Sequence, residues 1–239
     1  MIVVIPAKNE AQSIGNVLIG LDRIGVLAVV CDDLSTDGTR GVVEKFPDVR
    51  LVTGSGSGSG SAIKLALSRA LYRDNFGPFV QMDADAQHPT DKILDICAPI
   101  ISGRADVVIG SRYCPGGGGS VSGWISKASA WMLSYALWCI GINVYDPTSG
   151  FRAYSRAAAI IASSQLPNQY PETEALLIFR RYGLRIFEIP VEMLPRRFGK
   201  STIGLCAGIG IIYRGLWAIA REGLWMLRIG NGWFAPRKA

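Results

Sequence analysis

The stretch Phe79-Val80-Gln81-Met82-Asp83-Ala84-Asp85-Ala86-Gln87-His88-Pro89 joins a short apolar run to two acidic residues. Its apolar half is typical of a buried strand. Side chains two residues apart in extended chain point to the same side, so Asp83 and Asp85 can converge beyond the strand, and Gln87 continues the spacing. Paired carboxylates suit Mg²⁺ or Mn²⁺, ions that proteins commonly share with substrate phosphates. The alternative is an acidic turn that caps the following helix.

Around this stretch, apolar runs and helical segments alternate about every 25 residues, as in chains of βαβ units. The runs that we expect to form strands are residues 2–5, 27–31, 50–53, 79–82 and 105–110. Helices are expected after residue 9, after residue 37, and at 62–72 and 90–101. The alternation predicts an α/β fold with a Rossmann-like, mostly parallel sheet and helices on both faces.

Polar clusters follow four of the five expected strands. They are Asn9-Glu10, Asp32-Asp33, Asp83 to Asp85, and Ser111-Arg112. In open parallel sheets, ligands bind beyond the carboxyl ends of the strands. We therefore expect these clusters to lie together at one edge of the sheet and to form the site.

The Gly/Ser run at residues 54–61 follows the expected third strand. Two interpretations give this run no role in ligand binding: a flexible linker or a low-complexity segment. The run lacks the Gly-Lys-Ser/Thr ending of a P-loop, and it follows the third strand rather than the first. We interpret it as a loop that lets the backbone approach a ligand.

All six tryptophans lie after Gly119. Trp124, Trp131 and Trp138 are seven residues apart, so on a helix they form one stripe, and we expect that stripe to face the core. The final apolar segment, residues 202–229, carries an arginine every seven residues. Its uncharged run from 201 to 213 is too short to span a bilayer. The pattern favours an amphipathic helix in the membrane interface, and a helix packed on the domain is the alternative.

Composition and charge indicate the domain organisation, the kind of partner and the cellular compartment. The 239 residues, 49% of them apolar, allow one large domain at 1–201 and a short basic segment at 202–239. The net charge of +6 is concentrated after residue 180, which predicts an anionic partner or surface. No nucleic-acid motif is present, so we expect no nucleic-acid partner. Five scattered cysteines without CxxC spacing, and no visible signal peptide, indicate a cytoplasmic protein.

Six stretches, in chain order, carry a family resemblance. They are Pro6-Ala7-Lys8-Asn9-Glu10, Asp32-Asp33-Leu34-Ser35-Thr36-Asp37-Gly38-Thr39, Asp83-Ala84-Asp85-Ala86-Gln87-His88-Pro89, Gly110-Ser111-Arg112-Tyr113, Asp146-Pro147-Thr148-Ser149-Gly150-Phe151-Arg152 and Arg196-Arg197-Phe198-Gly199-Lys200-Ser201. With these motifs the chain resembles the family 2 glycosyltransferases, especially their dolichol-phosphate-mannose-synthase-like branch. The matches extend over nearly the whole chain.

The resemblance implies a GT-A fold and an inverting, metal-dependent transfer with Mg²⁺ or Mn²⁺ as cofactor. The implied donor is a nucleotide sugar, GDP- or UDP-linked. The implied acceptor is a polyprenyl phosphate, dolichyl or undecaprenyl, at the cytoplasmic face of a membrane. Relatives that append paired transmembrane helices differ from this chain, so we expect a peripheral protein on the inner face. A membrane-protein partner and a homo-oligomer are left open.

The resemblance also implies roles for single residues. The positions that hold the nucleotide sugar are matched by Pro6, Ala7, Glu10, Asp32, Asp33, Asp83 and Ala84. The metal-binding motif is matched by Asp83, Asp85 and Gln87. Phosphate-gripping positions are matched by Arg112 and Arg196, and Asp146 matches a carboxylate near the acceptor that is often assigned as base. With Asp85, these last three form the expected catalytic set, and His88 is expected to orient the loop.

The role of Asp146 depends on the acceptor. A phosphate is already ionised near neutral pH, since its second pKa is about 6, and it scarcely needs a base. With a phosphate acceptor, we expect Asp146 to position the acceptor or to contact the metal. With a hydroxyl acceptor on a glycan or lipid-linked saccharide, Asp146 would be the general base. A third hypothesis, a non-catalytic membrane-associated binding module, conflicts with the intact acidic motif.

Overall fold

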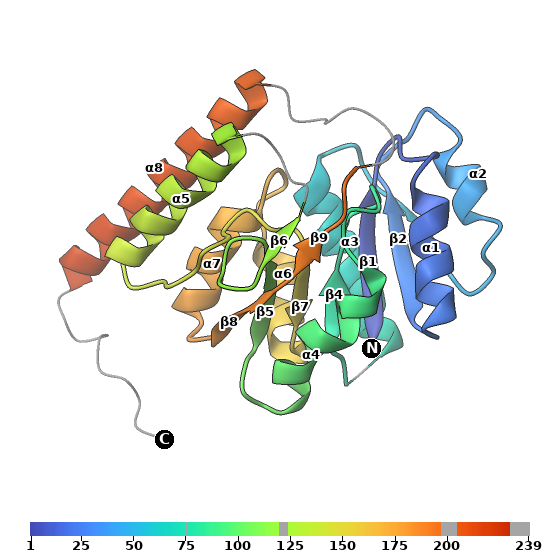
Figure 1. The fold of residues 1–239 in the computed structure, drawn as a ribbon, viewed down its shortest axis with the longest axis horizontal. Coiled ribbons are helices and arrows are strands. Elements are labelled where there is room, and N and C mark those ends of the chain that lie inside the picture. Colours follow the sequence, from blue (N-terminus) through green and yellow to red (C-terminus); the bar gives the residue numbers. More distant parts are fainter. Residues whose placement is uncertain (75, 120–123, 197–204, 230–239) are drawn as a thin grey trace.

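The computed structural model describes residues 1–74, 76–119, 124–196 and 205–229. Within these ranges, one sheet has the strand order β3-β2-β1-β4-β7-β5-β8 (Figure 1). Its strands are β1 (Ile2–Ala7), β2 (Leu27–Asp32), β3 (Arg50–Thr53), β4 (Phe79–Gln81), β5 (Val107–Ser111), β7 (Arg152–Tyr154) and β8 (Ile186–Pro190). Neighbouring strands are parallel except where β7 pairs with β4 and β5. The predicted mostly parallel sheet is confirmed.

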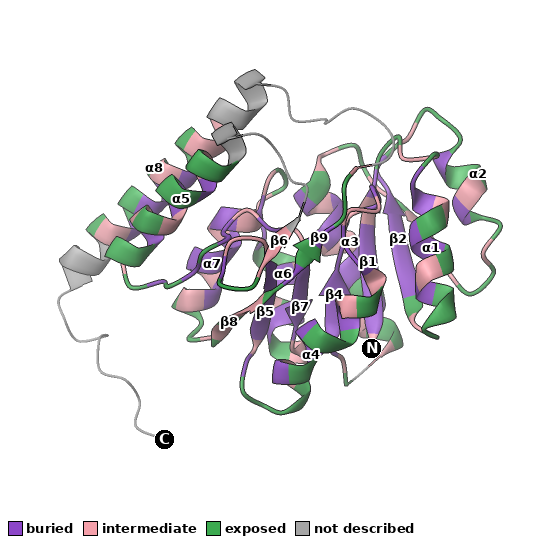
Figure 2. Ribbon diagram, viewed as in Figure 1, coloured by how far each residue is buried: buried purple, intermediate pink, exposed green. Residues whose placement is uncertain are grey.

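Helices cover both faces of this sheet, and the strands between them are buried (Figures 1 and 2). The core on one face includes residues of α1 (Ile14–Arg23) and α4 (Ile93–Ile101), and the core on the other includes residues of α3 (Ser59–Arg73) and α6 (Arg156–Gln165). Successive side chains of β1 alternate between the two cores. A strand covered on both faces reads as a continuous apolar run, which is why the sequence pattern locates it.

The predicted boundaries differ from the observed ones by a few residues. The helix expected at 90–101 is a short 3₁₀ turn (Thr90–Lys92) followed by α4, and the helix expected after residue 37 is α2 (Thr39–Val43). At one edge of the sheet lies β8, which ends at Pro190. After it, β9 (Glu192–Met193) leaves the main sheet and pairs with β6 (Gly118–Gly119).

The sequence pattern does not predict β7 or its position between β4 and β5. This strand has three residues and lies within a turn-rich stretch, so it has no recognisable period. Its place is set by pairing on both sides, because Ala153 is in register with Val80 of β4 and with Val108 of β5. The antiparallel direction brings the loop that precedes β7 to the carboxyl edge of the parallel strands.

Three helices pack together beside β5 and β8, and one of them, α7, also contributes to the core on the sheet face that α3 and α6 cover. They are α5 (Trp124–Cys139), α7 (Glu172–Arg181) and α8 (Leu205–Ile229), and α5 and α8 lie side by side (Figure 1). A third apolar cluster joins them and includes Leu133, Leu176 and Ile219, one from each helix. Among the described residues, no helix combines the length and the apolar character that are needed to cross a membrane.

The expectation that the tryptophan stripe of α5 faces the core is wrong for Trp131 and Trp138, which are 60% and 63% exposed. The helix instead buries Ala130, Leu133 and Leu137. The buried and exposed stripes lie one residue apart in the sequence, so spacing alone does not show which of them faces inward. The side chain of Trp124 lies outside the described residues.

The helix α8 buries one strip of its surface against α5 and α7. Gly215, Ala218, Ile219 and Glu222 are spaced for one helical face. Glu222 is 1% exposed and forms an ion pair with Arg181 of α7. Residues 197–204 and 230–239 lie outside the described residues, and they include most of the motif at 196–201 and the end of the basic segment.

Candidate active site

The polar clusters predicted to meet at the carboxyl edge of the sheet do so at its centre. Glu10 interacts electrostatically with Asp83, Asp85 and Arg196. Asp83 in turn interacts with Arg112 and Arg196. The loop before β7 lies against the same group, since a Cβ atom at Gly150 would be 3.0 Å from Asp83 Oδ2. A glycine there lets the loop approach the carboxylate.

The loop after β4 orders the two aspartates. The strand ends at Gln81, and Ala86 has a φ of 62°, so the loop turns rather than continuing in extended conformation. The backbone N–H of Asp83 donates to His88 Nδ1 at 2.9 Å, and the imidazole stacks on Phe151. Burial lowers the pKa of His88 to about 4, which keeps the ring neutral. The predicted role of His88 in orienting the loop is confirmed.

The two aspartates differ in their surroundings. The Asp83 side chain is 46% exposed, whereas that of Asp85 is 7% exposed. Asp85 Oδ2 accepts a hydrogen bond from Arg196 Nη2 at 2.6 Å, and Oδ1 accepts one from the backbone of Gln87 at 3.0 Å. Burial and the neighbouring charge of Asp83 raise the pKa of Asp85. Arg196 therefore offsets negative charge that a divalent cation could also offset.

The donor set fits a hard divalent ion whose coordination is completed by a ligand. Within the described ranges, no group of three His, Cys, Asp or Glu side chains is arranged to hold a metal. Asp83 and Asp85 supply two carboxylates, and a nucleotide diphosphate could supply further oxygens. The side-chain amide of Gln87, the third predicted ligand, lies 3.5 Å from the Leu194 carbonyl oxygen.

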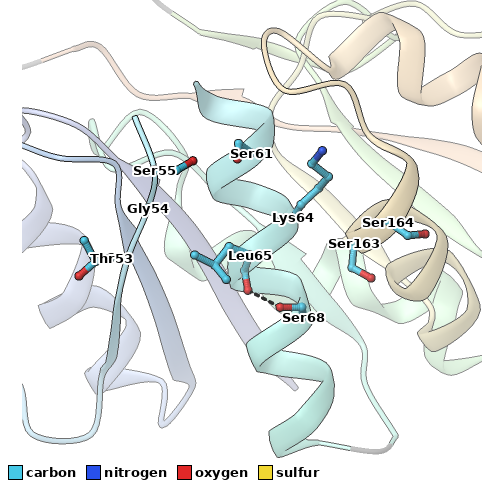
Figure 3. A pocket seen from close by; sticks show the side chains of 9 residues that line it. All are labelled: Thr53, Gly54, Ser55, Ser61, Lys64, Leu65, Ser68, Ser163 and Ser164. Atoms are coloured by element: carbon cyan, nitrogen blue, oxygen red, sulfur yellow. Dashed lines mark hydrogen bonds between the residues drawn. The ribbon is translucent and has the colours of Figure 1, made fainter. Parts of the chain in front are cut away.

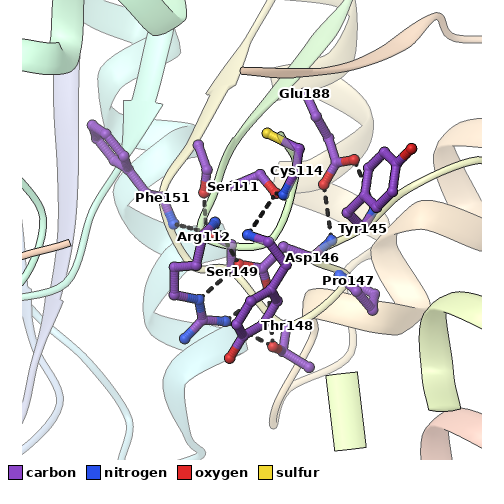
Figure 4. A network of polar contacts seen from close by, with 12 residues as sticks. Ser111, Arg112, Cys114, Tyr145, Asp146, Pro147, Thr148, Ser149, Phe151 and Glu188 are labelled. Atoms are coloured by element: carbon purple, nitrogen blue, oxygen red, sulfur yellow. Dashed lines mark hydrogen bonds and ion pairs between the residues drawn. The ribbon is translucent and has the colours of Figure 1, made fainter. Parts of the chain in front are cut away.

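Two residues of the expected catalytic set, Arg112 and Asp146, form a bidentate ion pair with each other (Figure 4). Arg112 Nε donates to Asp146 Oδ2 and Arg112 Nη2 donates to Oδ1, both at 2.7 Å. The backbone N–H of Arg112 and the hydroxyl of Thr148 also donate to this carboxylate, at 3.1 Å each. Asp146 is fully buried, and in the part of the chain that is described no partner contacts Arg112 Nη1.

Sequence reasoning misses Glu188 of β8. Its two carboxylate oxygens accept the backbone N–H groups of Tyr145 and Asp146, at 2.7 and 2.9 Å. Burial raises the pKa of Glu188, and the two amides oppose that shift. No sequence signal identifies this contact, because Glu188 and Asp146 are distant in the chain and Glu188 looks like an ordinary polar residue of an edge strand.

The nucleoside end of the predicted site is organised by Asp33. Its Oδ1 accepts the N–H of Gly56 at 2.7 Å and its Oδ2 accepts that of Gly58 at 3.1 Å. A Cβ atom at Gly54 would lie 2.5 Å from Asp33 Oδ1. The Gly/Ser run is thus an ordered loop that leads into the first turn of α3, and both oxygens of Asp33 are used in holding the loop.

The other residues expected to hold the donor lie at or beyond the ends of β1 and β2, except Asp83 and Ala84, which follow β4. Asp32 is buried and accepts the N–H of Ser35, and the Ala7 carbonyl accepts the N–H of Asp33. Glu10 accepts a hydrogen bond from Ser13 at 2.6 Å, and burial raises the pKa of Glu10. The two remaining predicted positions are Pro6, which is partly exposed, and Ala84, which is buried.

An open hollow of about 430 Å³ lies on the outer side of α3 (Figure 3). It is lined by Thr53, Gly54, Ser55, Ser61, Lys64, Leu65, Ser68, Ser163 and Ser164. Lys64 donates to the side chain of Asn168 at 2.6 Å. The hollow borders the Gly/Ser loop but shares no lining residue with the predicted site.

Residues 2–160 match the family model described as "Glycosyl transferase family 2". The chain belongs to glycosyl transferase family 2. This glycosyltransferase is 30% identical over 242 residues to an undecaprenyl-phosphate mannosyltransferase of Micrococcus luteus, with 94% of the chain and 97% of that relative covered. It is 29% identical over 220 residues to a polyprenol monophosphomannose synthase of Mycolicibacterium smegmatis, with 84% and 80% covered.

Among solved structures, the glycosyltransferase is similar to glucosyl-3-phosphoglycerate synthase of Mycobacterium tuberculosis. In the complex of that protein with Mn²⁺, uridine diphosphate and phosphoglyceric acid, the TM-score is 0.69 at 20% identity. The match covers 92% of this chain and 77% of the other. At this identity the likeness establishes the fold, and the predicted GT-A architecture is confirmed.

Proposed function

We propose that this glycosyltransferase transfers a sugar from a GDP- or UDP-linked donor to a polyprenyl phosphate, with inversion at the anomeric carbon and with Mg²⁺ or Mn²⁺ bound. The names of the two relatives support a lipid-phosphate acceptor. The Mn²⁺ and uridine diphosphate bound by the structural neighbour support the donor and the metal. In the chain itself, the observation that carries the proposal is the environment of Asp146.

Asp146 has no acceptor site left for a substrate hydroxyl. Its carboxylate accepts three hydrogen bonds from Arg112 and one from Thr148. An ionised carboxylate offers about four lone-pair sites, so these four bonds occupy it. A hydroxyl acceptor requires a general base, whereas a phosphate with a second pKa of about 6 is already ionised at neutral pH. The arrangement favours the phosphate acceptor over the hydroxyl alternative.

The reaction is a single displacement at the anomeric carbon. A lone pair of an acceptor phosphate oxygen forms the new bond, and the bond to the donor diphosphate breaks with its electrons leaving on the diphosphate. Asp146 holds the guanidinium of Arg112, and among the described residues Nη1 has no hydrogen-bond partner, so this group can bind the acceptor phosphate. Arg196 lies close enough to the carboxylates to contact phosphate charge on the donor side.

Asp83, Asp85 and Gln87 would hold the metal. When bound, the ion supplies Lewis-acid stabilisation of the charge that develops on the leaving diphosphate. Asp83 is the more accessible carboxylate, while Asp85 must exchange its bond with Arg196. Asp32 and the segment from Pro6 to Glu10 would hold the nucleoside beyond the ends of β1 and β2, with Asp33 fixing the neighbouring loop.

The exposed face of α5 and α8 would bind the membrane. Both helices present aromatic residues to solvent: Trp131, Tyr135 and Trp138 on α5, and Tyr213 and Trp217 on α8. Lys127 lies over the ring of Trp131, and Arg221 lies over that of Trp217. Aromatic rings beside cationic side chains suit an anionic lipid headgroup layer. Residues 1–201 would then form the catalytic domain and 202–239 the membrane-surface segment.

The inner face of the membrane is the proposed location. None of the four cysteines whose side chains are described forms a disulfide, which suits a reducing compartment. That compartment is also where a nucleotide-sugar donor is expected. Peripheral attachment on this side would bring the donor and the lipid phosphate to the same edge of the sheet.

The test is a transfer assay with purified protein and a panel of nucleotide sugars. Each donor is offered with a short polyprenyl phosphate, or with the matching polyprenol, in the presence of Mn²⁺ or of EDTA. We expect transfer to the phosphate only, and loss of transfer in EDTA. An Asp85→Asn variant should lose at least about 100-fold in rate, since it removes a ligand of the ion that stabilises the leaving group.

The matched control is Asp106→Asn, because Asp106 is a carboxylate that forms an ion pair with Arg185 away from the site. It should retain wild-type transfer. Efficient transfer to the polyprenol with none to the phosphate would overturn the proposed acceptor. Full activity in EDTA would overturn the proposed metal dependence.

A further inference from the structure

Glu188 holds the backbone of the loop that carries Asp146. The two oxygens of its carboxylate are divided between neighbouring amides, one accepting from Tyr145 and the other from Asp146 (Figure 4). This is a two-point contact between the side chain of β8 and a loop that precedes β7. Without it, two adjacent N–H groups lose their acceptor, and that of Asp146 belongs to a fully buried residue.

The same loop fixes the direction of the Arg112 guanidinium. Asp146 receives Nε and Nη2 of Arg112 on separate oxygens, each at 2.7 Å, in the parallel geometry of a bidentate pair. Such a pair is sensitive to rotation of the carboxylate about its backbone. A change at the Asp146 amide is therefore passed to the guanidinium, although Glu188 and Arg112 share no direct hydrogen bond among the described residues.

Glu188 and Arg112, the first and last residues in this series of contacts, are both positioned by the pairing of β5 with β8. Glu188 is in register with Ile109, and Arg112 directly follows Ser111, the last residue of β5. The parallel pairing of β5 with β8 fixes the distance between Glu188 and the start of the Arg112 segment. The Asp146 loop lies between them, held from one side by Glu188 and from the other by Arg112.

A carboxylate is specifically suited to this position. Two amide N–H groups need two acceptors, and an ionised carboxylate provides an acceptor oxygen to each. In a Glu188→Gln variant, the side-chain nitrogen would be a donor facing another donor. The contact would keep at most one of its two bonds with almost no change in volume.

We propose that Glu188 is a positioning residue for the acceptor phosphate: it fixes the Asp146 loop, and through Asp146 it aims Arg112 at the phosphate. The proposal rests on the proposed function for the identity of the acceptor. It assigns a role in the reaction to a residue of the edge strand that touches neither donor nor acceptor. The chemistry at the anomeric carbon and the binding of the donor do not depend on Glu188.

A double-mutant cycle between Glu188→Gln and Arg112→Ala tests the coupling. In the wild-type background, Glu188→Gln should lower kcat/KM for the lipid phosphate about 10–100-fold, the usual cost of losing a residue that orients a ligand-binding side chain. The KM for the nucleotide sugar should stay within about twofold of wild type. In the Arg112→Ala background, the same change should lower kcat/KM less than about threefold. Equal losses in the two backgrounds would overturn the proposal.

The control is Glu192→Gln, which makes the same chemical change at an exposed position of β9 and should leave all these values unchanged. A second measurement is independent of activity: hydrogen exchange of Arg112 Nε–H by NMR, assigned with Arg112→Lys. We expect exchange to become at least about tenfold faster in Glu188→Gln and not in Glu192→Gln, since the bond that protects this proton opens more often. Unchanged exchange in Glu188→Gln would refute the proposal.

The two measurements separate the proposal from the proposed function. If the wild-type protein does not use polyprenyl phosphate, the proposed function is refuted. The exchange experiment still decides in that case whether Glu188 orders Arg112. If Glu188→Gln unfolds, Glu188→Asp replaces it, since its shorter carboxylate reaches at most one of the two amides. Wild-type exchange in a folded Glu188→Asp protein would also refute the proposal.

Discussion

Removing the side chain of Arg196 should strengthen the binding of Mn²⁺ to the protein without nucleotide. Arg196 Nη2 lies 2.6 Å from Asp85 Oδ2, an oxygen that the proposed metal site requires. In the absence of ligand, the guanidinium and the ion compete for this oxygen. The Arg196→Ala variant removes the competitor and leaves both carboxylates in place.

The size of the effect follows from the exposure of the two partners. A hydrogen bond to a charged group contributes about 1.5–3 kcal/mol. The Asp85 side chain is 7% exposed but that of Arg196 is 27% exposed, so the guanidinium regains water when it is displaced. Allowing for that screening, the net competition is roughly 1–2 kcal/mol. This corresponds to about a 5- to 30-fold lower Kd for Mn²⁺ in Arg196→Ala.

The assay is a titration of free Mn²⁺ by electron paramagnetic resonance, without nucleotide or acceptor. The matched control is Arg185→Ala, which removes the same charge from an ion pair with Asp106 at the opposite end of β5. Its Kd for Mn²⁺ should equal that of wild type. If Arg196→Ala binds Mn²⁺ no more tightly than Arg185→Ala, then Arg196 does not compete with the ion and the reasoning is refuted.

Three further predictions concern stability and the membrane. Burial lowers the pKa of His88 to about 4, so as pH falls from 7 to 5 the imidazole takes up a proton in the unfolded state and not in the folded state; in urea titrations at both pH values, the unfolding free energy of the wild type should fall about 2 kcal/mol further than that of His88→Asn. An equal loss in the variant would contradict this. Glu222→Ala should lower the unfolding free energy by roughly 1–3 kcal/mol, because it removes the buried carboxylate through which α8 pairs with Arg181 of α7; an unchanged denaturation midpoint would show that the pair does not hold α8. Replacing Trp131 and Trp217 together by alanine should weaken binding to anionic vesicles at least about tenfold in cosedimentation while changing stability little, since both rings are exposed. Wild-type binding by that variant would exclude this face as the membrane contact.

The sequence predicts the parallel part of the fold well because burial on both faces leaves a clear signal. Ile2 to Ile5 read as a continuous apolar run, and they alternate between two cores. β7 leaves no such signal, because three residues are too few to show a period and the strand is specified by its neighbours. The direction of the α5 stripe is likewise set by tertiary packing, which buries Leu133 and exposes Trp131.

The sequence predicts which residues form the candidate site better than it predicts the hydrogen bonds between them. Motif spacing identifies the carboxylates and arginines, and the sheet edge gathers them. It does not indicate that Arg112 and Thr148 together occupy the carboxylate of Asp146, or that Asp33 is used in holding the Gly/Ser loop. Both facts depend on which hydrogen-bond partners the fold brings within reach. Glu188 is missed for the same reason, since its contact joins segments that are distant in the chain.

Because β7 runs antiparallel to its neighbours, the donor side and the acceptor side of the proposed site come from different halves of the chain. Loops that follow strands β1 to β4 would meet the activated sugar, and all of them come from the first half of the chain. The loop that enters β7, together with the segments around β8, comes from the second half and would meet the lipid. Lineages of such enzymes could exchange one lipid carrier for another by substitutions downstream of β5, while the machinery that recognises the nucleotide stayed as it was.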